Sequence, residues 1–217
     1  MARFVKEMGG TEAFQKIQSQ HVVGRIEMAA QGITGKVEVF AKRPDKLVIK
    51  ISIPGMGDLL QGFDGKVGWS LNPATGPMVL EGKMLEQVRE QARFDAVLHD
   101  PSDFKSLETT GNVPFEGKDC YQIKVVRKSG QPATEYYDVG TGLLSGSTET
   151  QETPLGAIAV TATISDYKRF DGVLYATRLV QKMGPLAQVM TFENMEMNTV
   201  ADAAFELPPS IQALIKK

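Results

Sequence analysis

Few residues in this chain could do chemistry, and their spacing matches no catalytic or metal-binding motif. His21 and His99 are the only two histidines, and a metal site would require His99 to converge with Asp100 and Asp103. An aspartate that caps the next turn explains the same residues better. Cys120 is the only cysteine, so it can form neither an internal disulfide nor a thiolate metal site. We predict no catalytic residue, no metal ligand and no cofactor, and therefore no enzyme.

Nucleotide and nucleic-acid binding also lack their signals. Gly55 and Gly57 are followed by a glycine only at position 62, which fits neither a dinucleotide fingerprint nor a phosphate-binding loop. No Gly-x-Ser-x-Gly elbow occurs in the chain. The 24 basic and 26 acidic residues give a net charge of −2 without charged blocks. Such a surface offers no footprint for a phosphate backbone, so nucleic acid is excluded as a partner.

The hydrophobic pattern predicts an α+β protein made mostly of strands. The first residues, about 2–19, favour a short helix that is broken at Gly9-Gly10, and the three-and-four spacing over about 81–96 predicts one amphipathic helix. Between and after these helices the apolar period is two, which is typical of antiparallel strands. With 217 residues and no linker, we expect a single domain, 1–217, with roughly eleven strands.

A sheet of that many strands must curl, because strand twist accumulates. We therefore expect one large curved antiparallel sheet, an unclosed half-barrel wrapped around a helical lid. Its inward face and the lid would line an apolar cavity. The predicted lining residues are Val22, Ile26, Met28, Val37, Val39, Leu47, Ile49, Ile51, Val67, Trp69, Leu71, Met84, Leu85 and Val88.

Several segments resemble the LolA/LolB-like family of periplasmic lipoprotein carriers. The resemblance lies in a succession of motifs between positions 35 and 73 and in the closing segment. These motifs are Lys42-Arg43-Pro44-Asp45, Pro54, Asp64-Gly65-Lys66, Val67-x-Trp69, Asn72-Pro73 and Phe205-Glu206-Leu207-Pro208-Pro209. The opening residues depart from the family's usual first helix, and no lipid-attachment cysteine lies near the start.

The resemblance implies an unclosed barrel whose interior takes the acyl chains of a lipoprotein, or another lipid, for outer-membrane lipoprotein sorting. Its partners would be an inner-membrane donor and an outer-membrane acceptor. Arg43 matches the family arginine that bonds to the lid, so it is the predicted gating residue. Met56 lies in a Gly-rich turn where the family's receptor carries an exposed apolar residue, which implies a transient contact with a membrane surface.

Two further questions stay open at the level of sequence. The N-terminus carries no stretch of signal-peptide length, so the protein is either cytoplasmic or begins after a removed signal, and the resemblance favours the periplasm. The same fold also occurs in the sensory domain of an envelope-stress regulator. A sensor or protein-interaction module that uses the same groove is therefore the alternative function, and a lipid hydrolase comes third.

Overall fold

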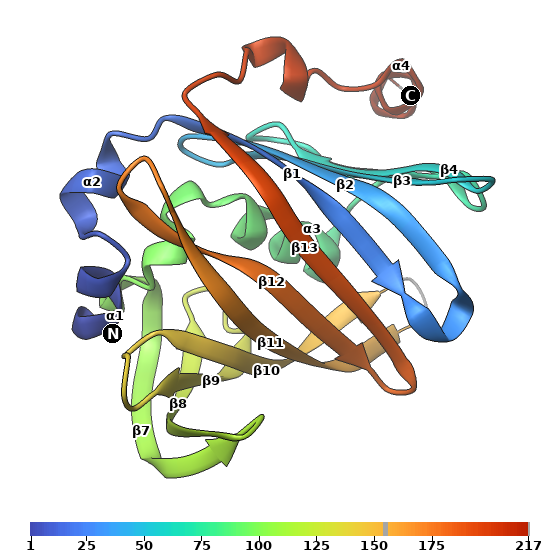
Figure 1. Cartoon of the computed structure of the whole chain (residues 1–217). Coiled ribbons are helices and arrows are strands. Elements are labelled where there is room, and N and C mark those ends of the chain that lie inside the picture. The colour runs from blue at the N-terminus through green and yellow to red at the C-terminus, as the bar shows by residue number, and fades with distance from the viewer. Residues whose placement is uncertain (154–155, 217) are drawn as a thin grey trace. The chain divides into compact units, whose positions relative to one another are not determined.

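The computed structural model describes residues 1–153 and 156–216 (Figure 1). In these residues thirteen strands form one antiparallel sheet with the order β6-β5-β4-β3-β2-β1-β13-β12-β11-β10-β9-β8-β7. The order is linear, with β6 at one end and β7 at the other, so the predicted large antiparallel sheet is confirmed. No helix in the described part of the chain is long and apolar enough to cross a bilayer.

The strands are β1 (Ser19–Met28), β2 (Ile33–Lys42), β3 (Lys46–Ile53), β4 (Gly57–Phe63), β5 (Gly68–Asn72), β6 (Gly76–Val79), β7 (Phe104–Phe115), β8 (Lys118–Arg127), β9 (Pro132–Asp138), β10 (Leu144–Thr153), β11 (Gly156–Phe170), β12 (Val173–Met183) and β13 (Leu186–Met197). The α-helices are α1 (Ala2–Glu7), α2 (Thr11–Gln15), α3 (Gly82–Ala92) and α4 (Pro209–Ile215). Short 3₁₀ turns are η1 (Ala29–Gln31), η2 (Phe94–Leu98), η3 (Pro101–Asp103) and η4 (Asp202–Phe205).

The expectation of roughly eleven strands is wrong by the two strands at the ends of the sheet. β6 has only four residues and contains Pro77. β7 is exposed at most of its positions and contains Gly111 and Pro114, so it lacks an alternating apolar pattern. A strand at the edge of a sheet pairs on one side only, so it can contain proline and polar residues. A prediction based on alternating apolar residues therefore misses such a strand.

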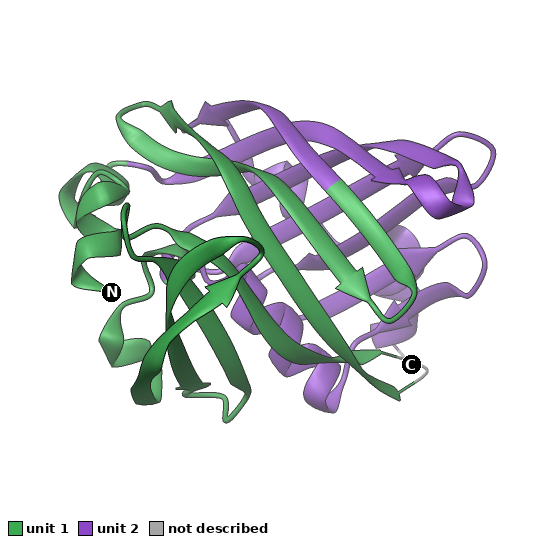
Figure 2. Ribbon diagram, turned by 60° about the horizontal axis from the view of Figure 1, so that its bottom comes forward, with its two compact units in different colours: residues 1–16, 96–189 green, residues 17–95, 190–217 purple. Residues whose placement is uncertain are grey.

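The chain divides into two compact units (Figure 2). Unit 1 comprises residues 1–16 and 96–189, and unit 2 comprises residues 17–95 and 190–217. The expectation of a single domain stays a prediction. The strands of both units belong to one sheet, but the contacts within the chain divide it into two units.

The two expected helices are present but shorter than predicted. The N-terminal segment forms α1 and α2, which are separated at Gly9 and Gly10, both with positive φ. At Gly9 a Cβ would lie 2.8 Å from the carbonyl oxygen of Gly172, so only glycine fits this close approach. α3 ends at Ala92, and the chain continues through Arg93 into η2.

Unit 1 has its own core, in which α1 packs on the sheet. Phe4 of α1 and Met8, which follows the helix directly, are buried together with Tyr137 of β9 and Leu144 of β10. The ring of Phe4 meets that of Tyr137 edge-on, with centroids 5.6 Å apart. Apolar residues at three- and four-residue spacing on α1 therefore explain its position.

Unit 2 carries a core on each face of its strands. On one face α3 packs on β3, β4 and β5. On the other face η4 and α4 cover the strands, where Phe205 and Ile211 pack with Val48 and Trp69. The closing segment that resembles the family's last strand is therefore not a strand, because Phe205 ends η4 and Pro209 begins α4.

Candidate functional site

The apolar face of β1, β2 and β3 in unit 2 is the candidate binding surface. Val22 pairs with Val39, which in turn pairs with Ile49, so the three side chains share a face. The same alternation places there all the predicted lining residues of these strands, which are Val22, Ile26, Met28, Val37, Val39, Leu47, Ile49 and Ile51. Their common face is confirmed, whereas their role as ligand contacts stays a prediction.

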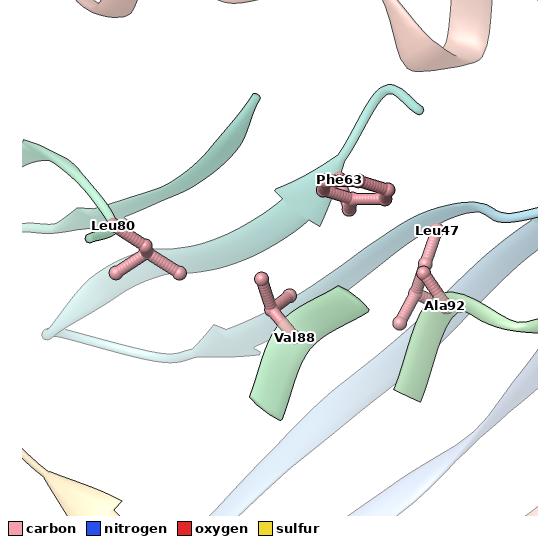
Figure 3. Close-up of a cluster of buried hydrophobic side chains, with 5 residues drawn as sticks. All are labelled: Leu47, Phe63, Leu80, Val88 and Ala92. Atoms are coloured by element: carbon pink, nitrogen blue, oxygen red, sulfur yellow. The ribbon is translucent and has the colours of Figure 1, made fainter. Parts of the chain in front are cut away.

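α3 lies on the part of this face that β3 contributes, and it extends over β4 and β5. Val88 and Ala92 of the helix are buried against Leu47, Phe63 and Leu80 (Figure 3). The other two predicted helix residues, Met84 and Leu85, are partly buried against the same cluster. The structure therefore brings the predicted helix residues together with three of the predicted sheet residues, Val39, Leu47 and Ile49.

A glycine on β5 allows the helix to come this close. A Cβ at Gly68 would lie 2.8 Å from Cγ1 of Val88 and 2.9 Å from Cδ1 of Leu85, which is closer than real Cβ atoms approach. The neighbouring residue, Trp69, must then point to the opposite face, because successive strand residues alternate.

The prediction that Trp69 and Leu71 line the α3 face is wrong. Trp69 pairs with Gly62 and Leu71 pairs with Leu60, and both belong to the face that η4 and α4 cover. A Cβ at Gly62 would lie 2.5 Å from the indole, which shows that the ring lies flat over this glycine.

Val67 is misplaced as well, because it lies in a turn and not in β5. Phe63 pairs with Gly68, which leaves the four residues 64–67 in the connection between β4 and β5. The carboxylate of Asp64 closes this turn by accepting hydrogen bonds from the backbone N–H groups of Lys66 and Val67, at 2.8 and 2.7 Å. A side chain that caps its own turn stabilises this connection.

Arg43 joins the end of β2 to the segment that follows α3. Its Nη1 donates to both carboxylate oxygens of Asp95, at 2.6 and 2.5 Å, and its Nε donates to the carbonyl oxygen of Ile17 at 2.7 Å. The guanidinium also lies 4.7 Å from the ring centroid of Phe94. A backbone bond reinforces this contact, since Phe94 N–H donates to the carbonyl oxygen of Pro44 at 3.0 Å.

These contacts refine the expectation for Arg43. The resemblance implied bonds from this arginine to the backbone of the lid, whereas here it pairs with a carboxylate just beyond the helix. The side chain of Arg43 is 18% exposed and that of Asp95 is 52% exposed, so solvent screens the ion pair from one side only. The gating role stays a prediction.

A groove of about 760 Å³ opens where β1 and β3 end and β2 and β4 begin. Its apolar lining comes from Ile26, Gly35 and Ile53, and Ile26 is also one of the predicted cavity residues. The remaining lining residues are mostly polar or charged, namely Arg25, Glu27, Thr34, Lys36, Ser52, Pro54 and Asp58. An apolar lining edged by charges of both signs suits a ligand that is apolar along its length and polar at its end.

Met56 lies at the tip of the β3–β4 hairpin and is 54% exposed. The turn is closed by its backbone N–H, which donates to the carbonyl oxygen of Ile53 at 3.1 Å, while Gly55 and Gly57 on either side adopt positive φ. The exposed position that the resemblance implies is therefore present, and the membrane contact itself stays a prediction.

Sequence reasoning missed a buried charged cluster in unit 1. Glu135 of β9 is only 1% exposed, and its Oε2 lies 3.1 Å from Nδ1 of His99. The hydroxyl of Tyr137 donates to the same oxygen at 2.7 Å. Arg127 lies between Glu135 and Glu149, with its Nη2 3.9 and 3.8 Å from their carboxylates. An acidic residue between Ala133 and Tyr137, two residues of a buried strand face, is the signal that could have revealed it.

The surroundings keep Glu135 ionised. Burial raises the pKa of its carboxyl, but the hydrogen bonds and charge that it receives from His99, together with Tyr137 and Arg127, outweigh burial and hold the pKa below its usual range. The pKa of the Tyr137 phenol changes in the opposite direction. Burial first and the charge of Glu135 second raise the pKa of Tyr137.

Asp100, next to His99 in the chain, caps a 3₁₀ turn. Its Oδ1 accepts a hydrogen bond from the backbone N–H of Ser102 at 2.7 Å, which confirms the predicted cap of η3. The hydroxyl of Ser102 first, and this backbone bond second, lower the pKa of the Asp100 carboxyl.

Comparison with known proteins shows the fold. No family model matches the sequence. No curated protein matches it either. A DUF1329 family protein from Desulfovibrio piger aligns with a TM-score of 0.63 at 14% identity, covering 94% of this chain and 95% of that one.

Two further solved structures agree. A LolA superfamily protein from Nitrosomonas europaea aligns with a TM-score of 0.59 at 14% identity, over 94% of this chain and 97% of that one. An outer-membrane lipoprotein-sorting protein domain from Vibrio parahaemolyticus aligns with a TM-score of 0.55 at 12% identity, over 95% and 97%.

Proposed function

Because the chain has the LolA-like fold, we propose that it is a periplasmic carrier that takes up the acyl chains of a lipoprotein or a similar lipid. The observation that carries this proposal is the apolar face that β1 to β3 share. α3 covers Val39, Leu47 and Ile49 of this face, and Arg43 binds Asp95 in the segment that follows the helix. The apolar face would receive the acyl chains when α3 moves away. This function requires binding and release, and no chemical turnover.

The magnitudes fit a carrier that needs a gate. An acyl chain of about fifteen methylenes gains roughly 12 kcal/mol on burial, at about 0.8 kcal/mol for each methylene, before the cost of ordering. Such a gain suffices to extract a lipid from a membrane but opposes its release. A carrier therefore needs a contact that favours the closed, empty state.

The contacts of Arg43 fit that requirement. One partly screened ion pair with a half-buried hydrogen bond to Ile17 is worth about 1 to 2 kcal/mol. That difference shifts a two-state equilibrium by a factor of about 5 to 30. The contacts of Arg43 would thus favour the closed state of the lid, and the open state would still be populated.

The test is native mass spectrometry with organic extraction on protein purified from its own envelope, comparing wild type with Arg43→Leu. We expect acyl lipid or lipoprotein to co-purify with the wild type. The amount should increase about 5- to 30-fold in Arg43→Leu, because the contacts of Arg43 no longer favour the closed, empty state over the open, loaded one. Arg169→Leu is the matched control, since this arginine donates to the carbonyl oxygen of Gly172 in unit 1.

Two results would contradict the carrier function. One is an empty wild type and an empty Arg43→Leu that also take up no fluorescent fatty acid. The other is the capture of a membrane protein by a chain that holds no lipid, which would favour the sensor function instead.

The location and the partners belong to the same proposal. A carrier of this kind would work in the periplasm, between an inner-membrane donor and an outer-membrane acceptor. The exposed thioether of Met56 at the hairpin tip would provide its transient contact with the membrane surface, because an apolar side chain at such a tip can enter the headgroup region.

A further inference from the structure

Three hairpin turns of unit 2 lie at the same end of its strands. β1 to β6 pair antiparallel in the order of the sequence, so every second connection falls at the same end of the sheet. At one end these connections are residues 29–32, 54–56 and 73–75, and all of their residues are exposed. This end of unit 2 lies at the right of the view in Figure 1. We call these three turns the hairpin rim.

The hairpin rim contains no charged residue. Its turns read Ala29-Ala30-Gln31-Gly32, Pro54-Gly55-Met56 and Pro73-Ala74-Thr75. The connections at the opposite end, 43–45 and 64–67, each contain one acidic and one basic residue. Charged side chains are the usual residues of an exposed surface, because they keep their water there. An exposed end without them can leave water and leave no charge unpaired.

Hydrogen bonds and close packing fix the shape of the hairpin rim. A backbone hydrogen bond closes each of the three turns. In the third turn Asn72 accepts two bonds, from the backbone N–H of Thr75 at 3.2 Å and, through its side chain, from that of Ala74 at 2.8 Å. The second and third turns touch, since a Cβ at Gly57 would lie 3.2 Å from Cγ of Pro73. Turns that are already ordered lose little conformational entropy when they dock on a surface.

The groove that opens at this end carries charges of both signs in equal number. Its charged lining residues are Arg25, Lys36, Glu27 and Asp58. Three of them form ion pairs, and their partners are Glu193, Glu38 and Lys50. Exposed ion pairs are weak and can exchange partners. This arrangement matches a zwitterionic lipid headgroup, which presents a phosphate and an ammonium group, and it lacks the excess of lysine and arginine that selects anionic lipids.

We propose that the hairpin rim docks on the surface of a bilayer with zwitterionic headgroups and so places the groove against the membrane. The proposal rests on the carrier function and extends the contact of Met56 to the two neighbouring turns. The thioether of Met56 would enter the headgroup region, and the small residues at 29–32 and 73–75 would let the backbone come close. A lipid that leaves or enters the bilayer at this end would meet the groove directly.

Flotation of the full chain with phosphatidylcholine vesicles tests the docking. We expect the wild type to float with these vesicles, and its binding to change by less than about twofold with added phosphatidylglycerol or with salt, since no net charge attracts it. Ala30→Asp and Ala74→Asp each add one carboxylate to a turn that does not contain Met56. Each should weaken binding roughly tenfold, because a carboxylate at the contact must lose its water.

Lys66→Gln is the matched control, because it changes the net charge by the same amount at the opposite end of the strands. It should bind like the wild type. A wild type that does not float with phosphatidylcholine, or that floats only with phosphatidylglycerol at low salt, would overturn the proposal. Unchanged binding in both Ala30→Asp and Ala74→Asp would also overturn it and leave Met56 as a single contact. Wild-type flotation decides even if a variant fails to fold.

Lipid extracted from the purified protein separates this proposal from the carrier function. Bound lipid in a protein that does not float with vesicles would refute the hairpin rim alone. A protein that floats as expected but holds no lipid and takes up no fluorescent fatty acid would refute the carrier alone.

Discussion

The indole of Trp69 shows how a single side chain can test which face of the sheet binds ligand. It is 2% exposed and packs with Val48, Phe205 and Ile211, on the face away from α3. We expect Trp69→Ala to lower the free energy of unfolding by about 3 to 5 kcal/mol, because it leaves a cavity in this core. Lipid retention by the folded fraction should stay at the wild-type level.

Urea unfolding followed by circular dichroism measures the stability, and native mass spectrometry measures the retained lipid. Leu107→Ala is the control, since Leu107 is 37% exposed and its loss should change stability by no more than about 0.5 kcal/mol. Loss of lipid in folded Trp69→Ala would mean that the ligand occupies the Trp69 face.

At the scale of elements, the position of α3 depends on the absence of one Cβ at Gly68. We expect Gly68→Ala to cost about 1 to 3 kcal/mol, because Val88 is stiff in a helix and cannot yield easily to the new methyl group. Val88→Ala alone should also destabilise the protein, by removing buried methyl groups.

The double variant Gly68→Ala/Val88→Ala should cost clearly less than the sum of the two, since the second change makes room for the first. Denaturant unfolding of the four proteins gives this coupling, and hydrogen exchange over residues 82–92 shows whether the helix loosens. Strict additivity would contradict the close packing of α3 on β5.

At the scale of the whole molecule, the shifted pKa values predict how stability depends on pH. Hydrogen bonds from Thr141 lower the pKa of Asp138, and bonds from Lys42 and Lys46 lower that of Asp202. The unfolded chain then binds more protons than the folded one in acid. Stability is therefore fully present above about pH 4 and falls as the pH drops through the lowered values.

In alkaline solution the raised pKa values of two tyrosines make stability fall as the pH rises. Burial raises the pKa of Tyr137 and Tyr167, so the folded state keeps these phenols neutral while the unfolded state ionises. Stability should hold up to about pH 10 and decrease above it. Urea midpoints across pH measure both limbs. Tyr167→Phe should flatten the alkaline limb, and Asp138→Asn the acid limb; an unchanged profile in either variant would contradict the assignment.

The sequence alone determined most of the strands and the shared face of Val22, Val39 and Ile49, because a period of two is a local property that burial on one side imposes. It also determined α3, whose apolar residues follow the helical spacing. The similarity in fold to a LolA superfamily protein and to a lipoprotein-sorting protein domain agrees with the motifs between positions 35 and 73.

Only the tertiary structure decided the rest. The turn closed by Asp64 and the small residues Gly62 and Gly68 set which face Trp69 takes, because a strand's alternation fixes relative and not absolute orientation. The partners of Glu135 and Arg43 come from segments far away in the chain, namely His99 and Asp95. Contacts between such segments depend on how the chain folds as a whole, and no local pattern encodes them.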